Sequence, residues 1–248
     1  MIHIRNIARW NFCLFALLGL ASLSAQVSFT DTYTEDFNTL PFNTNYTDPF
    51  TFTNNDTLTG WYSNRDGSAR ASTGGASEYG NGIYSWGAQN DTERALGTFL
   101  IDGFSPDTAY IGVQLQNNSG ATIESVKLDY LIEQWRRNTN ATTWTGDYLV
   151  TADSGSMIAH GTPGYVAIPE AEVTAESTGA SGGMNGNYGP NQQSFSITLN
   201  GLSWGDGEYL WIRWANAQGT DSSALAIDDF TVSAIPEAES SSYLLFLG

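Results

Sequence analysis

The chain has 248 residues, and its nine lysines and arginines stand against 26 aspartates and glutamates, giving a formal net charge of −17 at pH 7. Proteins that bind nucleic acid through phosphate contacts need clustered basic residues, whereas this chain has a single lysine, Lys127. The composition therefore excludes that class of protein, and it also argues against docking on anionic membrane surfaces. Few charged residues (14%), many aromatic ones (13%) and 26 glycines are typical of a β-rich domain.

The first 25 residues have the order of a secretory signal peptide. Arg5 and Arg9 form a basic start, residues 10–21 are almost wholly apolar, and residues 22–25 are mostly small. We therefore expect export through a secretory pathway and cleavage near Ala25. The only cysteine, Cys13, lies inside this signal, so the mature chain is expected to carry no thiol and a formal charge of −19, from seven basic and 26 acidic residues.

After the signal, apolar residues recur with a period of two and turn residues follow every ten or so positions, which predicts β-strands. In chain order, we expect strands at residues 30–37, 82–86, 95–100, 110–116, 125–136, 147–152, 194–199, 209–216 and 225–233. Every residue from 209 to 214 is bulky, so that strand is expected to be central and covered on both faces. The pattern predicts an all-β fold, a two-sheet antiparallel β-sandwich of the jelly-roll type, over residues 26–234.

Three long polar segments separate these strands, at residues 42–60, 63–81 and 170–193. Loops of this length are uncommon unless they bind a ligand or are disordered. The sequence leaves both interpretations open.

The residues needed for most hydrolytic mechanisms are missing from the mature chain. Its only histidine, His160, lies in a loop segment, and no serine has the surroundings of a nucleophile elbow. Paired carboxylates could still hydrolyse a glycosidic bond. Glu133 is the candidate for such a role, but we favour a structural ion pair with Arg136 or Arg213, because a buried arginine in a sheet needs a partner.

Two pairs of acidic residues lie near the ends of the domain, Glu35 with Asp36 and Asp228 with Asp229. Terminal strands of a sandwich often pair, which would bring the four carboxylates together, and a structural Ca²⁺ would relieve their repulsion. The inward parity changes between Ile227 and Phe230, which indicates a β-bulge at Asp228 and Asp229 unless both faces are buried. These four residues are the predicted metal ligands, with hydrogen-bonded or solvated acids as the alternative.

Several segments taken together resemble a family of bacterial secreted β-sandwich domains found in PEP-CTERM sorting-domain proteins. They are residues 84–87, 93–97, 112–120, 133–136, 210–214 and 225–230. The resemblance covers nearly the whole mature chain and implies no catalytic residue. Residues 235–248 are similar to the start of a PEP-CTERM sorting signal, although Ala238 replaces its second proline and only five apolar residues follow. Because a membrane span needs about 20 such residues, we expect a truncated tail, with release of the protein or a frayed, partly apolar end as the alternatives. This tail is the only part that would reach a membrane.

The first hypothesis for function is an exported, non-catalytic protein of the cell surface or extracellular matrix, sorted through this tail. The alternative is a carbohydrate-binding module for extracellular polysaccharide, in which exposed aromatic rings stack on sugars. The candidate rings are Trp61, Trp86, Trp135 and Trp144. A glycan hydrolase that uses paired carboxylates is a third interpretation.

Overall fold

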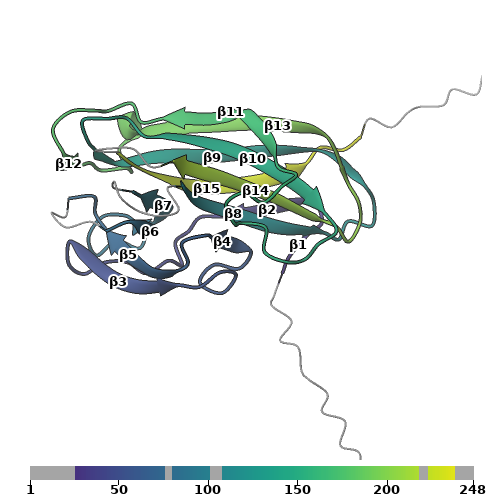
Figure 1. Cartoon of the computed structure of the whole chain (residues 1–248), viewed down its shortest axis with the longest axis horizontal. Helices are drawn as coiled ribbons and strands as arrows, with labels where there is room; N and C mark the ends of the chain where they lie inside the picture. Colours follow the sequence, from purple (N-terminus) through teal and green to yellow (C-terminus); the bar gives the residue numbers. More distant parts are fainter. Residues whose placement is uncertain (1–25, 76–79, 101–107, 218–222, 238–248) are drawn as a thin grey trace, which may run out of the picture.

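The computed structural model describes residues 26–75, 80–100, 108–217 and 223–237, which form a sandwich of two β-sheets (Figure 1). The predicted signal peptide and most of the predicted sorting tail lie outside these residues. Across the described ranges, no helix has the length and apolar character needed to cross a membrane.

The first sheet has six strands in the order β1-β8-β14-β10-β11, and β4 also pairs with β8. Their bounds are β1 (Val27–Phe29), β4 (Trp61–Ser63), β8 (Thr108–Asn117), β10 (Thr143–Thr151), β11 (Val166–Thr174) and β14 (Tyr209–Ala217). The second sheet has nine strands in the order β12-β9-β15-β7-β6-β5-β3, while β13 also pairs with β9 and β2 with β15. Their bounds are β2 (Thr32–Glu35), β3 (Thr47–Phe52), β5 (Gly67–Ser72), β6 (Gly82–Trp86), β7 (Ala95–Phe99), β9 (Ile123–Arg137), β12 (Gly182–Gly183), β13 (Gln192–Trp204) and β15 (Ala224–Ala234). A short 3₁₀ helix, η1 (Gly189–Asn191), precedes β13.

The all-β, two-sheet architecture predicted from the sequence is confirmed, and each predicted strand coincides with a strand of the structure. The expectation of purely antiparallel pairing is wrong at two places, because β1 pairs with β8 and β5 with β6 in parallel. The three segments expected as loops also contain strands, among them β3, β5 and part of β11. These segments are rich in threonine, serine and asparagine, so they lack the apolar alternation by which a strand is predicted. Pairing with neighbouring strands decides that they become strands.

The main core lies between the sheets and is rich in aromatic residues. Trp214 from the central strand β14 packs edge-on against Phe230 of β15, with ring centroids 5.5 Å apart, and Trp61 of β4 stacks near Trp214 at 6.3 Å. Both faces of β14 are buried, as its sequence predicts: Leu210 and Ile212 belong to the main core, whereas Trp211 belongs to a separate buried cluster. The sandwich therefore has apolar material outside its sheets as well as between them.

A second buried cluster covers the outer face of the second sheet. In β15, Leu225 and Ile227 point into the main core while Ala224 and Ala226 join this second cluster, because successive side chains of a strand point to opposite faces. The cluster also contains Tyr84, Trp86, Ala95, Phe99 and Trp135. Segments that pack over it turn this outer face into a partly enclosed surface.

The terminal strands pair, as expected, since Phe230 of β15 lies opposite Glu35 of β2. The predicted bulge is also present: the register of β15 against β9 shifts between Asp228 and Thr231, and Asp229 has a φ of +49°. The bulge places two successive aspartates between the inward-facing Ile227 and Phe230. Pairing and bulge together determine where the acidic residues of the sheet point.

Candidate acidic site on the outer face of the second sheet

The four tryptophans expected as exposed stacking platforms are all buried, with exposed fractions of 0–1%, so that expectation is wrong. Trp61 and Trp144 belong to the main core, and Trp86 and Trp135 belong to the cluster on the outer face of the second sheet. The presence of a tryptophan does not by itself predict an exposed ring, because large indole rings bury the most apolar area when they face the interior.

The aromatic residues that reach solvent lie in connecting segments and were not singled out from the sequence. Tyr46 is 68% exposed, Tyr188 60% and Phe42 45%. Two of them adjoin residues tied to the β6-β7 connection. Asn187, next to Tyr188, donates a hydrogen bond to the Glu93 carboxylate, and Asn43, next to Phe42, accepts one from Arg94.

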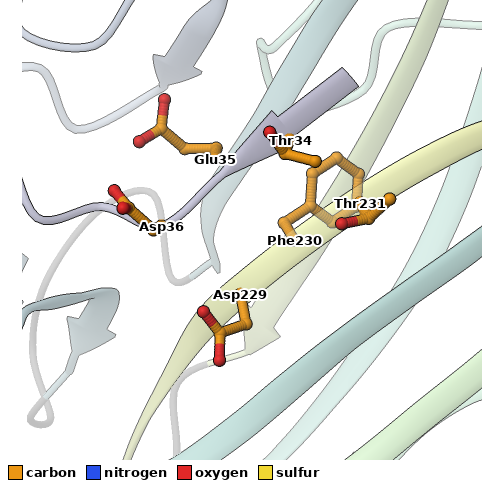
Figure 2. Close-up of a pocket in the computed structure, with 6 residues that line it drawn as sticks. All are labelled: Thr34, Glu35, Asp36, Asp229, Phe230 and Thr231. Atoms are coloured by element: carbon orange, nitrogen blue, oxygen red, sulfur yellow. The ribbon is translucent and has the colours of Figure 1, made fainter. Parts of the chain in front are cut away.

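Three of the four predicted metal ligands line a single hollow of about 370 Å³ between β2 and β15. Figure 2 shows Glu35 and Asp36 at the end of β2 and Asp229 on β15, with Thr34 and Thr231 beside them. The Glu35 carboxylate accepts a hydrogen bond from the Phe37 amide at 2.9 Å, and partial burial raises its pKa. The lining of this hollow is dominated by carboxylate and hydroxyl oxygens.

A second hollow of about 360 Å³ adjoins the first, and Asp229 belongs to both. It runs over β9 and β13, where Asp129 and the exposed hydroxyls of Ser194 and Ser196 contribute to its lining. Asp129 also pairs with Lys127, with an Nζ–Oδ1 distance of 2.9 Å at the surface. Tyr130, Leu131 and Phe195 line the second hollow as well, so its walls are both polar and apolar. We call the two hollows together the depression centred on Asp229, the residue that they share.

Asp228, the fourth predicted ligand, does not line either hollow, so the four residues do not form one cluster. It lies instead with Glu93 and Glu133, and one carboxylate oxygen of each lies within 4.8 Å of those of the other two. We call these three residues the carboxylate trio. Within the part of the chain that the structure describes, it is the only group of three or more potential metal-ligating side chains at that spacing.

Glu133 and Asp228 of the trio are almost fully buried, with exposed fractions of 1% and 4%, and N–H donors point at all three carboxylates. Trp135 Nε1 and Gln192 Nε2 each donate to Glu133 at 2.8 Å, and the backbone amide of Asp229 donates to Asp228 at 2.8 Å. The Asn187 amide donates to Glu93. These donors stabilise the ionised form of the carboxyl groups that they contact.

Burial raises the pKa of two members of the trio. One carboxylate oxygen of Glu93 lies within 4.8 Å of one of Asp228. Burial, then the neighbouring carboxyl groups of Glu93 and Glu133, raise the pKa of Asp228 to about 10. Burial likewise raises the pKa of Glu133 to about 7, even though Gln192 and Trp135 stabilise its charged form.

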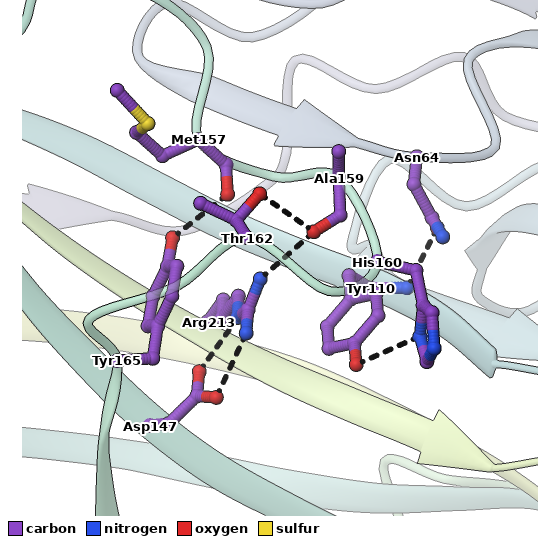
Figure 3. Close-up of polar contacts among 9 residues, drawn as sticks. All are labelled: Asn64, Tyr110, Asp147, Met157, Ala159, His160, Thr162, Tyr165 and Arg213. Atoms are coloured by element: carbon purple, nitrogen blue, oxygen red, sulfur yellow. Dashed lines mark hydrogen bonds and ion pairs between the residues drawn. The ribbon is translucent and has the colours of Figure 1, made fainter.

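Glu133 makes neither of the ion pairs expected for it. Arg213 pairs with Asp147 instead, through Nε–Oδ1 and Nη2–Oδ2 distances of 2.7 and 3.0 Å (Figure 3). The register explains the difference, because β14 pairs with β10 and places Arg213 directly opposite Asp147, whereas Glu133 belongs to the other sheet. Sequence reasoning predicted that Arg213 needs a partner but could not identify it.

His160 contacts the residues around Arg213 rather than a catalytic group. Its Nδ1 lies 3.2 Å from the hydroxyl of Tyr110, and Arg213 stacks between the rings of Tyr110 and Tyr165. Arg213 also donates to the carbonyl oxygen of Ala159 at 3.3 Å. These contacts attach the segment that connects β10 and β11 to the outer face of the first sheet (Figure 3).

Comparison with protein-family models and with curated proteins found no match. Among solved structures, the chain is similar to the CBM22-1 xylan-binding domain from Paenibacillus barcinonensis, with 9% identity, a TM-score of 0.39, and coverage of 86% of this chain and 99% of that one. The K3 adhesin domain of Lys-gingipain from Porphyromonas gingivalis matches at 13% identity and a TM-score of 0.43, covering 75% and 99%. A Stig cyclase from Fischerella matches at 13% and 0.42, covering 82% and 96%. At these scores, the similarities carry no argument about function.

Proposed function

We propose that this protein is an exported, non-catalytic carbohydrate-binding domain, whose ligand lies in the depression centred on Asp229. The observation that carries the proposal is that two hollows share one exposed carboxylate, with carboxylate and hydroxyl side chains along their walls and apolar residues beside them, namely Leu131, Phe195 and Phe230. Sugar hydroxyls are hydrogen-bond donors as well as acceptors. Carboxylates accept only, while serine and threonine do both, so this lining matches a polyhydroxylated ligand.

The size of the depression supports this function. Each hollow, at about 370 and 360 Å³, falls within the range of small-molecule sites.

The placement of the acidic residues favours binding over hydrolysis. Glycosidases need one protonated carboxyl and one carboxylate on either side of a substrate. The carboxyl groups with strongly raised pKa are Glu133 and Asp228, whose oxygens are engaged by N–H donors of the protein itself. None of the trio lines the hollows that the structure describes. We therefore place the protein among binding domains rather than enzymes.

Export and sorting complete the proposal and rest on the sequence. The signal-like residues 1–25 and the PEP-CTERM-like residues 235–248 would take the domain out of the cell and direct it to the surface. The excess of acidic residues is consistent with solubility in an external medium.

A glycan-array screen of the purified protein tests the proposal, followed by calorimetric titration with any glycan that binds. Asp229→Asn should weaken binding at least tenfold, about 1.4 kcal/mol, because it removes the negative charge shared by both hollows and replaces one of its two acceptor oxygens with an N–H donor group. Asparagine tolerates the positive φ at this position, so the fold should be retained. The control is Asp153→Asn, an exposed aspartate of the β10-β11 connection. An array without a reproducible ligand, or equal binding by both variants, would contradict the proposal.

A further inference from the structure

The outer strand of the second sheet has a pairing partner on one side only. β13 has 13 residues, and among the residues that the structure describes it pairs with β9 alone. Its pairing with β9 is continuous as far as Asn200, after which the register shifts and Ser203 has a φ of +49°. The side of β13 that faces away from β9 is therefore a free strand edge from Gln193 to Asn200, where backbone N–H and C=O groups point outward from alternate residues.

The other edge strands of the described sandwich carry features that prevent pairing with another chain. β11 contains Pro169 and two glutamates, and β3 contains Asp48 and Pro49. β1, β2, β4 and β12 have only two to four residues each. Charged residues, proline and short length are the usual means by which proteins avoid edge-to-edge association. The free edge of β13 has none of them, because residues 193–200 contain neither a proline nor a charged side chain.

The side chains along this edge suit a second copy of the same strand. Ser194, Ser196 and Thr198 are on the exposed outer face, whereas Phe195 and Ile197 pack on the main core. An antiparallel pair centred on Ser196 places Ser194 of each copy opposite Thr198 of the other. It also places Phe195 opposite Ile197. Hydroxyl pairs and pairs of an aromatic with a β-branched residue are favourable across strands, whereas like charges directly opposite each other are unfavourable.

The distribution of charge also favours contact between two copies at this strand. The chain has a formal net charge of −17, so two copies repel each other over most of their surfaces. On the neighbouring strand β9, the residues opposite Ser196 and Thr198 are Asp129 and Lys127, which form an ion pair with each other at 2.9 Å. The repulsion between two copies is therefore weak along β13.

We propose that β13 is a dimerisation edge, at which two copies of this chain pair antiparallel about a two-fold axis through Ser196 and join their second sheets into one. Such an interface uses the same surface of both copies, as a two-fold dimer requires. It goes beyond glycan binding and does not depend on any ligand. Ser194 and Ser196 also line the second hollow, so pairing would bring the second hollows of the two copies together. The value of that arrangement for glycan binding rests on the proposed function.

β11 limits the strength of the pairing. It lies beside β13 on the same side of the sandwich, where the Gln193 side chain donates to the carbonyl oxygen of Thr174 at 3.2 Å (Figure 1). Its exposed Glu170 and Glu172 would approach those of the second copy. Because salt screens repulsion between exposed charges, we expect a weak dimer that salt strengthens.

Sedimentation velocity of the purified protein, from micromolar to submillimolar concentration, measures the association without any glycan. We expect a reversible equilibrium between monomer and dimer, with a dissociation constant that falls when the salt concentration is raised. A protein that stays monomeric over the whole range would overturn the proposal, and so would a dimer that salt dissociates. Because no glycan is present, failure of this test is distinct from failure of glycan binding.

Two variants of the same positions test the register of the pair. Ser194→Glu with Thr198→Glu places like charges opposite each other, whereas Ser194→Lys with Thr198→Glu places opposite charges there. We expect their dissociation constants to differ at least tenfold, with the wild type between them. The control, Ser154→Glu with Ser156→Glu, adds two charges at exposed positions of the β10-β11 connection and should dimerise as the wild type does. Equal dissociation constants for the two β13 variants would refute pairing at this edge.

Cross-linking keeps the proposal testable if the charged variants do not fold. The chain has one cysteine, Cys13, so Ser196→Cys combined with Cys13→Ser leaves a single thiol. Residues directly opposite each other in an antiparallel pair have Cα atoms about 4.5–5.5 Å apart, which permits a disulfide. Mild oxidation should link Ser196→Cys into covalent dimers but leave Ser194→Cys monomeric, because its two thiols lie on either side of the axis. Equal cross-linking of both variants, or of neither, would overturn the proposal.

Discussion

Replacement of Arg213 by alanine is expected to destabilise the protein by about 3 kcal/mol. Arg213 forms a bidentate ion pair with Asp147. The Arg213 side chain is 5% exposed and the Asp147 side chain 25%. Removing one partner of a buried pair costs about 3–5 kcal/mol, and water reaching the part-exposed Asp147 reduces that cost. The lost contacts with the rings of Tyr110 and Tyr165, 4.3 and 3.4 Å from the guanidinium carbon, add about 0.5–2 kcal/mol each.

Urea denaturation at pH 7, followed by tryptophan fluorescence, measures this change as a shift in midpoint at constant slope. Arg213→Ala and Asp147→Ala, singly and combined, form a double-mutant cycle that isolates the coupling between the two side chains. The exposed pair Lys127 and Asp129 is the control, and Lys127→Ala should change stability by no more than about 0.5 kcal/mol. A loss for Arg213→Ala as small as that of the control would refute the reasoning.

Limited proteolysis provides a local readout of the same perturbation. Arg213 anchors the β10-β11 connection through the carbonyl oxygen of Ala159 and the ring of Tyr165. Without it, cleavage in residues 152–165 should become faster than cleavage elsewhere in the folded protein. Uniform cleavage would indicate that the connection is held by its apolar contacts alone.

Three further predictions follow from burial and packing. Trp61→Ala should cost about 3–5 kcal/mol in urea denaturation, because the ring is fully buried against Phe230; a loss below about 1 kcal/mol would contradict its assignment to the core. Gly186→Ala should lower the hydrogen-exchange protection of the Met184 amide, which bonds to the carbonyl oxygen of Trp135, because a Cβ at position 186 would lie 2.3 Å from the Trp135 ring; unchanged protection would show that the close contact is absent. Glu133→Gln should reduce the fall in unfolding free energy between pH 5 and pH 8. The wild-type carboxyl has its pKa raised to about 7, so its stabilisation is complete below about pH 4 and is lost as the pH rises through 7. Parallel pH profiles for wild type and Glu133→Gln would count against that assignment.

The sequence by itself determined the class of fold and several features of the terminal strands. The period of two identified nine strands, the bulky residues 209–214 identified a central strand, and the change of parity after Ile227 located the bulge. These inferences succeed because alternation along a strand is a local property, which depends only on whether successive side chains face the interior or the solvent.

Only the tertiary structure decided which acidic and aromatic residues meet. Asp228 and Asp229 are neighbours in sequence, yet the bulge directs Asp228 to Glu93 and Glu133 and leaves Asp229 at the junction of the two hollows. Glu93, 135 positions before Asp228, offered no local signal beyond its charge.

The same limit applies to Arg213 and to the tryptophans. Asp147 could not be chosen as the partner of Arg213 without the register of β10 against β14. Likewise, no pattern distinguished the buried Trp135 from the exposed Tyr188. Contacts between distant strands are fixed by pairing register and by the segments that fold over the sheets, and a single sequence encodes these only through the packing of the whole domain.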